Sequence, residues 1–217
     1  MRIKDVSARF AAIGVGAFLI VVALSSPVRA ASLYSAMTMD NAFDAYLSTD
    51  DSVLGTLIGS GTDWTTTYGL VGELTPAVTN YLHIVGYDFG GISAFIGDFE
   101  LDSGFSFAAT GTQSLTTIPA NWGVNLRGFG GAYSTPLDWG PNGIGPWGFR
   151  PAISAAAHFI WDPSACTSCT AYFSTAITPN APPVPEPSTV LLLGSGLAGL
   201  AALRRRSGQA KRNQSAA

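Results

Sequence analysis

The sequence predicts an all-β domain over residues 31–178, built as a two-layer jelly-roll-like sandwich and flanked by a terminal signal segment on each side. Short apolar runs rich in Phe, Tyr, Val, Ile and Thr recur there between clusters of Gly, Asn, Asp and Ser. No stretch of this segment longer than about ten residues keeps the 3.6-residue apolar period of a helix. Of the 217 residues, 47% are hydrophobic and 12% are charged, which excludes an intrinsically disordered chain because such chains are poor in apolar residues.

The first 30 residues have the pattern of a secretory signal peptide. Basic residues precede the 15-residue apolar run Phe10–Leu24, and small side chains at Val28 and Ala30 suit cleavage by signal peptidase between Ala30 and Ala31. An uncleaved anchor helix is the alternative, but the run is shorter than the ~20 residues that cross a bilayer. We therefore expect a mature chain that begins at Ala31.

The expected strands of the central domain have apolar alternation between turn-forming clusters. They are Ala42–Ser48, Gly69–Glu73, Asn80–Asp88, Ile92–Leu101, Gly104–Ala108, Ile153–Trp161 and Ala171–Ile177. In Asn80–Asp88 both alternating sets of side chains contain apolar members, as expected for a strand in a two-layer sandwich. The glycines and prolines between Ser103 and Pro151 predict long loops.

Tryptophans in this glycine-rich segment are the ligand candidates. Trp122, Trp139 and Trp147 could stack on sugar rings, while the alternative is that they cap the sandwich core. The run Thr38–Leu47, the strand Tyr81–Asp88 and the segment Ala157–Trp161 together resemble galactose-binding-like jelly-roll sandwiches. That resemblance implies a carbohydrate-binding role, although Ser48-Thr49-Asp50-Asp51 stands where such domains usually have an Asn-Gly turn.

Catalytic constellations are weak in this chain. Its two histidines, His83 and His158, lie inside expected strands, where packed and hydrogen-bonded histidines are common. No Gly-x-Ser-x-Gly motif is present. Asp98, Glu100 and Asp102 could supply paired carboxylates for glycoside hydrolysis, but alternate carboxylates also guard an edge strand against aggregation. We expect no enzymatic activity.

Neither a cofactor nor a zinc site is expected. Cys166 and Cys169 form a lone C-x-x-C pair, too few ligands for zinc, and outside the cell they are expected to form a local disulfide. Structural calcium stays possible because aspartates gather near expected strand ends. These aspartates are Asp40, Asp44, Asp50, Asp51, Asp63 and Asp88.

The C-terminal segment has three consecutive parts. A proline-rich linker over residues 179–187 ends in Val184-Pro185-Glu186-Pro187. The short apolar run Val190–Leu203 and then Arg204-Arg205-Arg206 follow, before an expected disordered tail over residues 207–217. Fourteen residues of helix rise roughly 21 Å, less than the ~30 Å hydrocarbon thickness, so we expect transient membrane contact. Positive charge would keep the arginines cytoplasmic and residues 31–189 outside.

Within this run, Gly194–Gly199 matches the G-x-G-x-x-G pattern of dinucleotide-binding folds. The match fails because no acidic residue follows in the remaining 18 residues and no βαβ unit surrounds it.

The tail over residues 184–206 resembles the PEP-CTERM sorting signal of Gram-negative bacteria that produce exopolysaccharide. This resemblance implies cleavage near Pro185-Glu186-Pro187 by an exosortase, a membrane protease-transpeptidase, after passage through the inner membrane. Release or transfer to the cell surface would follow. The implied partners are therefore signal peptidase and an exosortase-like enzyme.

Charge excludes a nucleic-acid partner. Residues 31–185 contain twelve Asp and Glu residues but only two basic ones, Arg127 and Arg150, for a formal charge of −10. Phosphate recognition needs a basic patch, and this segment has none. The sequence thus predicts a secreted or surface-sorted matrix protein without enzymatic activity, whose candidate ligand is an extracellular polysaccharide. There are two alternatives: a structural or adhesive protein with protein partners, or a secreted glycan-active enzyme.

Overall fold

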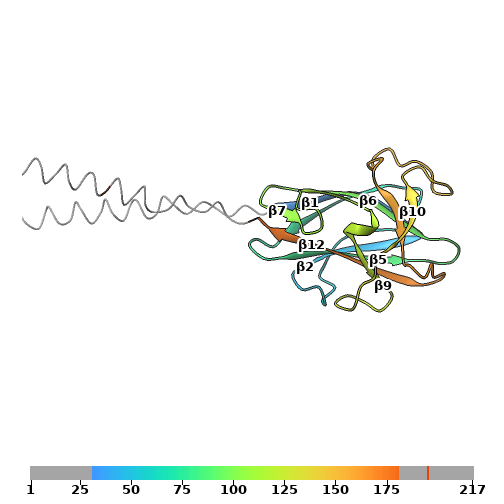
Figure 1. The fold of residues 1–217 in the computed structure, drawn as a ribbon, viewed down its shortest axis with the longest axis horizontal. Coiled ribbons are helices and arrows are strands. Elements are labelled where there is room, and N and C mark those ends of the chain that lie inside the picture. The colour runs from blue at the N-terminus through green and yellow to red at the C-terminus, as the bar shows by residue number, and fades with distance from the viewer. Residues whose placement is uncertain (1–30, 181–194, 196–217) are drawn as a thin grey trace, which may run out of the picture. The chain divides into compact units, whose positions relative to one another are not determined.

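Two antiparallel six-stranded sheets pack face to face and confirm the predicted all-β sandwich (Figure 1). The computed structural model describes residues 31–180 together with Ser195, which is helical. The expectations for the signal peptide, including Ala30, and for the sorting helix apart from Ser195, the arginine cluster and the tail fall on residues outside this described part. So does the proline-rich linker, except that its expected first residue, Pro179, is the last residue of strand β12. No helix among the described residues is long and apolar enough to cross a membrane.

Sheet A has the strand order β10-β11-β6-β1-β4, with β8 also paired to β6. Its strands are β1 (Ala31–Asp40), β4 (Tyr68–Leu74), β6 (Ala94–Leu101), β8 (Ser114–Thr116), β10 (Leu137–Pro141) and β11 (His158–Trp161). Sheet B has the order β3-β2-β5-β12-β7, with β9 also paired to β12. Its strands are β2 (Ala42–Ser48), β3 (Thr56–Gly61), β5 (Asn80–Tyr87), β7 (Phe105–Phe107), β9 (Gly123–Asn125) and β12 (Thr170–Pro179). A short 3₁₀ helix, η1 (Pro119–Asn121), precedes β9.

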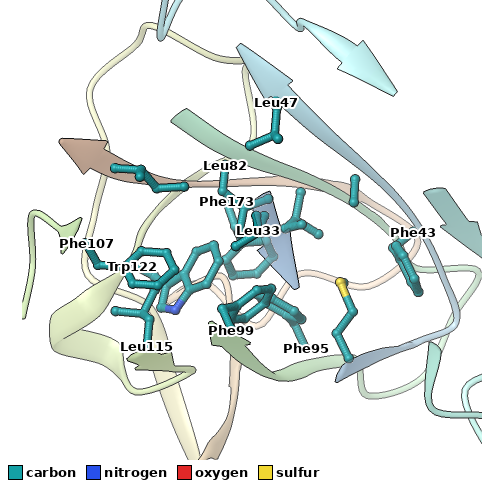
Figure 2. Close-up of a cluster of buried hydrophobic side chains, with 14 of the residues drawn as sticks. Leu33, Phe43, Leu47, Leu82, Phe95, Phe99, Phe107, Leu115, Trp122 and Phe173 are labelled. Carbon is teal, nitrogen blue, oxygen red and sulfur yellow. The ribbon is translucent and has the colours of Figure 1, made fainter. Parts of the chain in front are cut away.

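The main core lies between the two sheets and is rich in aromatic side chains. Alternate residues of each strand point inward, as in β6, where Phe95 and Phe99 enter the core from sheet A and meet Phe173 from sheet B (Figure 2). Gly86 of β5 lies where a Cβ atom would meet the Met39 side chain of the facing sheet, so glycine here lets the two sheets approach closely.

A second apolar cluster covers part of the outer face of sheet A. Its members are Ala94, Ile96, Trp147, Ile153, Ala157 and Phe159. Ala94 and Ile96 alternate along β6 with the core residues, so they point to the opposite face, which the loop over residues 142–157 covers. This explains why the strand expected from Ile153 begins only at His158: Ile153 and Ala157 are apolar because they pack from a loop. Both clusters come from residues 31–177, so this part of the chain has a core of its own.

Ala31 and Pro179 lie at one end of the sandwich (Figure 1). Leu33 of β1 pairs with Leu101, and the turn after Leu101 leads to Phe105, which pairs with Pro179. The β1–β2 turn, the β5–β6 loop and the start of β12 lie at the other end, since Asp40 pairs with Ala94 and Thr170 pairs with Tyr87. We call this second end the distal end.

Candidate functional site

The distal end gathers aromatic side chains from segments far apart in the sequence. Trp147 comes from the loop over residues 142–157, Trp139 from β10 and Phe89 from the β5–β6 loop. Trp147 and the backbone of Phe89 are tied to the β1–β2 turn by hydrogen bonds at Asp40 and Asn41. This cluster is the candidate site because it is the place where the described domain combines exposed aromatic rings with polar groups.

Trp147 is the centre of the cluster. Its ring stacks on Phe159 at a centroid distance of 4.9 Å, and its indole Nε1 donates a 3.0 Å hydrogen bond to Oδ2 of Asp40. Trp139 lies 6.2 Å away and donates from Nε1 to the carbonyl of Ser93. Trp147 is buried, whereas Trp139 keeps part of its surface exposed. The two indoles therefore differ in what they offer a ligand.

Arg150 fastens this loop to the neighbouring one. Its guanidinium donates to the carbonyls of Thr65 (2.8 Å) and Trp147 (3.0 Å) and lies 5.4 Å from the ring centroid of Trp64. The side chain is buried, and the Nε atom has no hydrogen-bond partner among the described residues. No role was assigned to Arg150 in the sequence analysis. The one feature that could have drawn attention to it is that residues 31–185 contain only two basic residues, Arg127 and Arg150.

Asp40 is the polar group beneath the tryptophans. Burial raises its pKa above the ordinary value of 3.8, because desolvation disfavours the charged carboxylate. The hydrogen bond from Trp147 opposes this shift, the charge of Asp88 adds to it, and the charge of Arg150 opposes it. The site thus holds a carboxylate whose protonation depends on the loop that covers it.

Two phenylalanines leave their rings open to solvent in this region. Phe89 is 74% exposed, and Phe149, on the loop that carries Trp147, is 60% exposed. The backbone N–H of Phe89 donates a 2.7 Å hydrogen bond to Oδ1 of Asn41, which fixes the loop that presents the ring. Such rings provide apolar faces on a fixed backbone.

The three tryptophans singled out in the sequence do not form one face. Trp139 and Trp147 come together, but Trp122 packs into the main core against Phe95 and Phe99 (Figure 2). The positions of Trp122 and Trp147 favour the alternative reading, in which tryptophans cap buried clusters. The most exposed aromatic residues of this region are instead the phenylalanines Phe89 and Phe149, which no sequence pattern had singled out.

Cys166 and Cys169 are joined by a disulfide bond at the start of β12. Asp88 fastens this short loop, since its Oδ2 accepts from the N–H of Ser168 and its own N–H donates to the carbonyl of Cys169. Oδ1 of the same carboxylate accepts from the N–H of Gly90. Asp88 therefore joins the disulfide loop to the loop that carries Phe89.

The histidines each contact a carboxylate. His83 is fully buried, with Nε2 3.1 Å from Oδ1 of Asp51. Ser174 donates to the same oxygen at 2.7 Å, so its hydroxyl is directed at the acid and not at the imidazole. Nδ1 of His158 lies 2.9 Å from both carboxylate oxygens of Asp138.

The alternating carboxylates of β6 do not guard a sheet edge, and that prediction is wrong. β6 is an interior strand, with β1 on one side and β8 and β11 on the other. Asp98 accepts from the N–H of Ser154 and Glu100 from the hydroxyl of Ser114, while Asp102 follows the strand and accepts from the N–H of Ser32. Asp98 thus connects sheet A to the loop that covers it, whereas Glu100 and Asp102 bond neighbouring strands of the same sheet.

The aspartates considered for calcium have hydrogen-bond partners of their own at separate places. Asp50 accepts from Ser52, and Asp63 from Thr65 and Thr66, and these bonds lower both pKa values. Asp44 accepts from Tyr87. Within residues 31–180, no three His, Cys, Asp or Glu side chains converge in a way that could hold a metal ion.

Comparison with known proteins identifies the tail. Residues 183–206 match the PEP-CTERM protein-sorting motif. No curated protein and no solved structure matches the chain, so the resemblance of the central domain to galactose-binding-like sandwiches has no match to support it. The motif implies processing by an exosortase and marks proteins for sorting to the cell surface or secretion. The chain is thus a two-sheet antiparallel β-sandwich that carries a PEP-CTERM protein-sorting motif at its C-terminal end.

Proposed function

We propose that this protein is a non-enzymatic, surface-sorted module that binds extracellular polysaccharide through its distal end. The observation that carries the proposal is that three aromatic residues of segments that reach the distal end keep exposed surface: Phe89, Phe149 and, in part, Trp139. Sugars stack their apolar faces on aromatic rings while nearby polar groups accept hydrogen bonds from their hydroxyls. Asp40 and Asn41 are polar groups of this kind at the same end.

The orientation of the domain supports this assignment. The chain leaves the sandwich at Pro179, toward the sorting motif, and the distal end lies at the opposite side. Loops on a rigid sandwich are also where binding residues concentrate.

A polysaccharide ligand fits the charge of the domain better than an acidic ligand does. Residues 31–185 carry a formal charge of −10, which repels nucleic acid and other polyanions. Neutral or basic sugars avoid that repulsion. The proposal is therefore restricted to neutral or cationic glycans.

The test is glycan-array binding by residues 31–180, followed by titration calorimetry with any polysaccharide that binds. Phe89→Ala and Phe149→Ala should each weaken binding roughly 5- to 150-fold, by analogy with the 1–3 kcal/mol lost when a stacked aromatic is removed. Tyr34→Ala is the matched control, because Tyr34 is an exposed aromatic residue of β1 on the outer face of sheet A. Its removal should leave the affinity unchanged.

Two results would contradict the proposal. The first is the absence of binding to any neutral or cationic glycan, which would favour the structural or adhesive alternative. The second is a polysaccharide affinity that depends on Tyr34 and not on the two phenylalanines. Hydrolysis of a bound glycan, detected by its reducing ends, would show instead that the protein is an enzyme.

The processing part of the function has its own test. The mature protein is expected to begin at Ala31 and to end between Pro185 and Ser188. Intact-mass measurement on the extracellular form checks both ends. A mass that retains Val190–Arg206 would show that the tail is not removed.

A further inference from the structure

The disulfide-bonded loop and the loop that carries Phe89 lie against each other at the distal end. The disulfide closes residues 166–169, between β11 and β12, and the Phe89 loop follows β5. A Cβ atom built on Gly90 would lie 3.7 Å from Oγ of Ser168, which places the two loops in contact. The chain has two cysteines, and both are in this bond. A reductant therefore has one target in the protein.

Asp88 joins these two loops through its carboxylate. The side chain is buried, and it accepts from the N–H of Ser168 at 2.8 Å and from the N–H of Gly90 at 2.7 Å. The N–H of Asp88 donates to the carbonyl of Cys169 at 2.9 Å. A buried carboxylate depends on such donors, because an unsatisfied buried charge is costly. The position of Ser168 therefore affects the segment that begins at Asp88.

Ser168 has an unfavourable backbone conformation inside the disulfide-bonded loop. Its φ is +55°, in the left-handed region that residues with a Cβ atom rarely adopt. Such a conformation persists only where the surrounding structure enforces it, and here the bond between Cys166 and Cys169 closes the loop around Ser168. When that bond opens, Ser168 can leave the left-handed region and turn its N–H away from Asp88.

The segment that presents Phe89 can change its conformation once Asp88 loses this donor. Two glycines follow the phenylalanine, Gly90 with φ +125° and Gly91 with φ +93°, and glycine has the widest choice of backbone conformations. The hydrogen bond from the N–H of Phe89 to Asn41 remains as a second restraint. Opening the disulfide should therefore let the ring of Phe89 take several positions without detaching the loop.

We infer that the Cys166–Cys169 bond is a redox switch of the distal end, and that its reduction by a thiol releases the loop that presents Phe89. The effect on ligand affinity rests on the proposed polysaccharide binding. In the reaction, a thiolate attacks one cysteine sulfur and forms a mixed disulfide, which a second thiolate then displaces. The protein S–S bond breaks, the two cysteine sulfurs take up two electrons and two protons, and the two thiol groups of the reductant become a disulfide.

The loop is suited to reduction while the domain stays folded. A disulfide that closes so short a loop adds little to the stability of the fold. By thermodynamic linkage, the fold then adds equally little to the stability of the bond. Ser164, Ala165, Thr167 and Ser168 around the cysteines are exposed, so a thiol can approach from solvent. Exposed disulfides of this kind are the ones that thiols reduce most readily.

Hydrogen–deuterium exchange on residues 31–180 tests the switch without any glycan. In dithiothreitol, the amides of Ser168 and Gly90 should exchange roughly ten-fold faster than in the oxidised domain, because each loses its bond to Asp88. The amide of Asp102, which donates to the carbonyl of Ser32 at the other end of the sandwich, should keep its rate. The double variant Cys166→Ser/Cys169→Ser should show the faster rates with and without dithiothreitol.

Glycan affinity tests the consequence for binding. For a polysaccharide that binds the oxidised domain, reduction should weaken the affinity roughly 2- to 10-fold, as expected if Phe89 occupies its binding position for about 10–50% of the time. Phe89→Ala should make the affinity insensitive to dithiothreitol, because the ring that reduction displaces is already absent. Phe149→Ala is the matched control, since its weaker affinity should still fall on reduction.

Three results would overturn the redox switch. The first is a bond that dithiothreitol does not reduce in the folded domain, and the second is unchanged exchange at Ser168 and Gly90 after reduction. The third is a reduced domain that binds the polysaccharide as tightly as the oxidised one. If the oxidised domain binds no glycan, the proposed function fails, whereas the exchange rates still decide whether the disulfide holds the Phe89 loop.

Discussion

Replacing Trp122 by alanine should destabilise the fold without affecting ligand binding. The indole is 4% exposed, lies 5.2 Å from Phe95 and 5.3 Å from Phe99 between ring centroids, and donates from Nε1 to the carbonyl of Thr116 at 3.3 Å. Removing a buried Trp side chain costs about 3–5 kcal/mol of unfolding free energy, through lost burial and the cavity left behind. For a domain of this size that corresponds to a fall in melting temperature of roughly 6–20 °C.

Thermal unfolding of residues 31–180, followed by circular dichroism, measures this effect. Phe149→Ala is the control, since an exposed aromatic residue should change the unfolding free energy by no more than about 0.5 kcal/mol. The two variants should show opposite behaviour in glycan binding, where Phe149→Ala loses affinity and Trp122→Ala does not. A Trp122→Ala protein that melts within about 2 °C of the wild type but has lost polysaccharide binding would refute the assignment of this indole to the core.

Three further predictions concern the distal end. Arg150→Met should cost about 2–4 kcal/mol of unfolding free energy, measured by urea denaturation, because it leaves two backbone carbonyls without a donor; an unchanged denaturation midpoint would contradict this role. Trp147→Phe should raise the pKa of Asp40 further in a carboxyl NMR titration, because the indole donor lowers it. A pKa of Asp40 that falls in this variant would contradict the cause given. Because the pKa of Asp40 in the folded protein is raised above 3.8, the stabilisation that Asp40 contributes is complete below pH 3.8 and is lost as the pH rises through the raised value. Replacing both Cys166 and Cys169 by serine should cost at most about 2 kcal/mol, because so short a loop restricts few unfolded conformations, and complete loss of folding would show that the bond does more.

Most of the longer strands could be located from the sequence, but β1 and β3 could not. β2 and β5 show apolar residues in alternation and were expected at nearly their observed bounds. β1 was missed over its whole length because Ala and Ser interrupt its apolar pattern, and β3 because two of its six residues are glycines. Their strand conformation comes from pairing with neighbours, β1 with β4 and β6 and β3 with β2, which a local pattern does not encode.

The candidate site was less accessible to sequence reasoning than the fold. Tryptophan is large and apolar wherever it lies, so Trp122, Trp139 and Trp147 looked alike in the chain. Their different environments depend on which face of sheet A is covered. The loop over residues 142–157 covers that outer face and buries Trp147, while β6 and β12 enclose Trp122 between the sheets. Long-range packing decides both.

The sequence by itself determined the class of the fold, the acidic character of the domain and the sorting motif. These are properties of composition or of contiguous residues, such as residues 183–206, and they need no knowledge of distant contacts. Only the tertiary structure decided that Arg150 bridges two loops, that β6 is an interior strand and that β4 is an open edge. Each of these depends on strand order and register, which arise when segments tens of residues apart bury their apolar faces against each other.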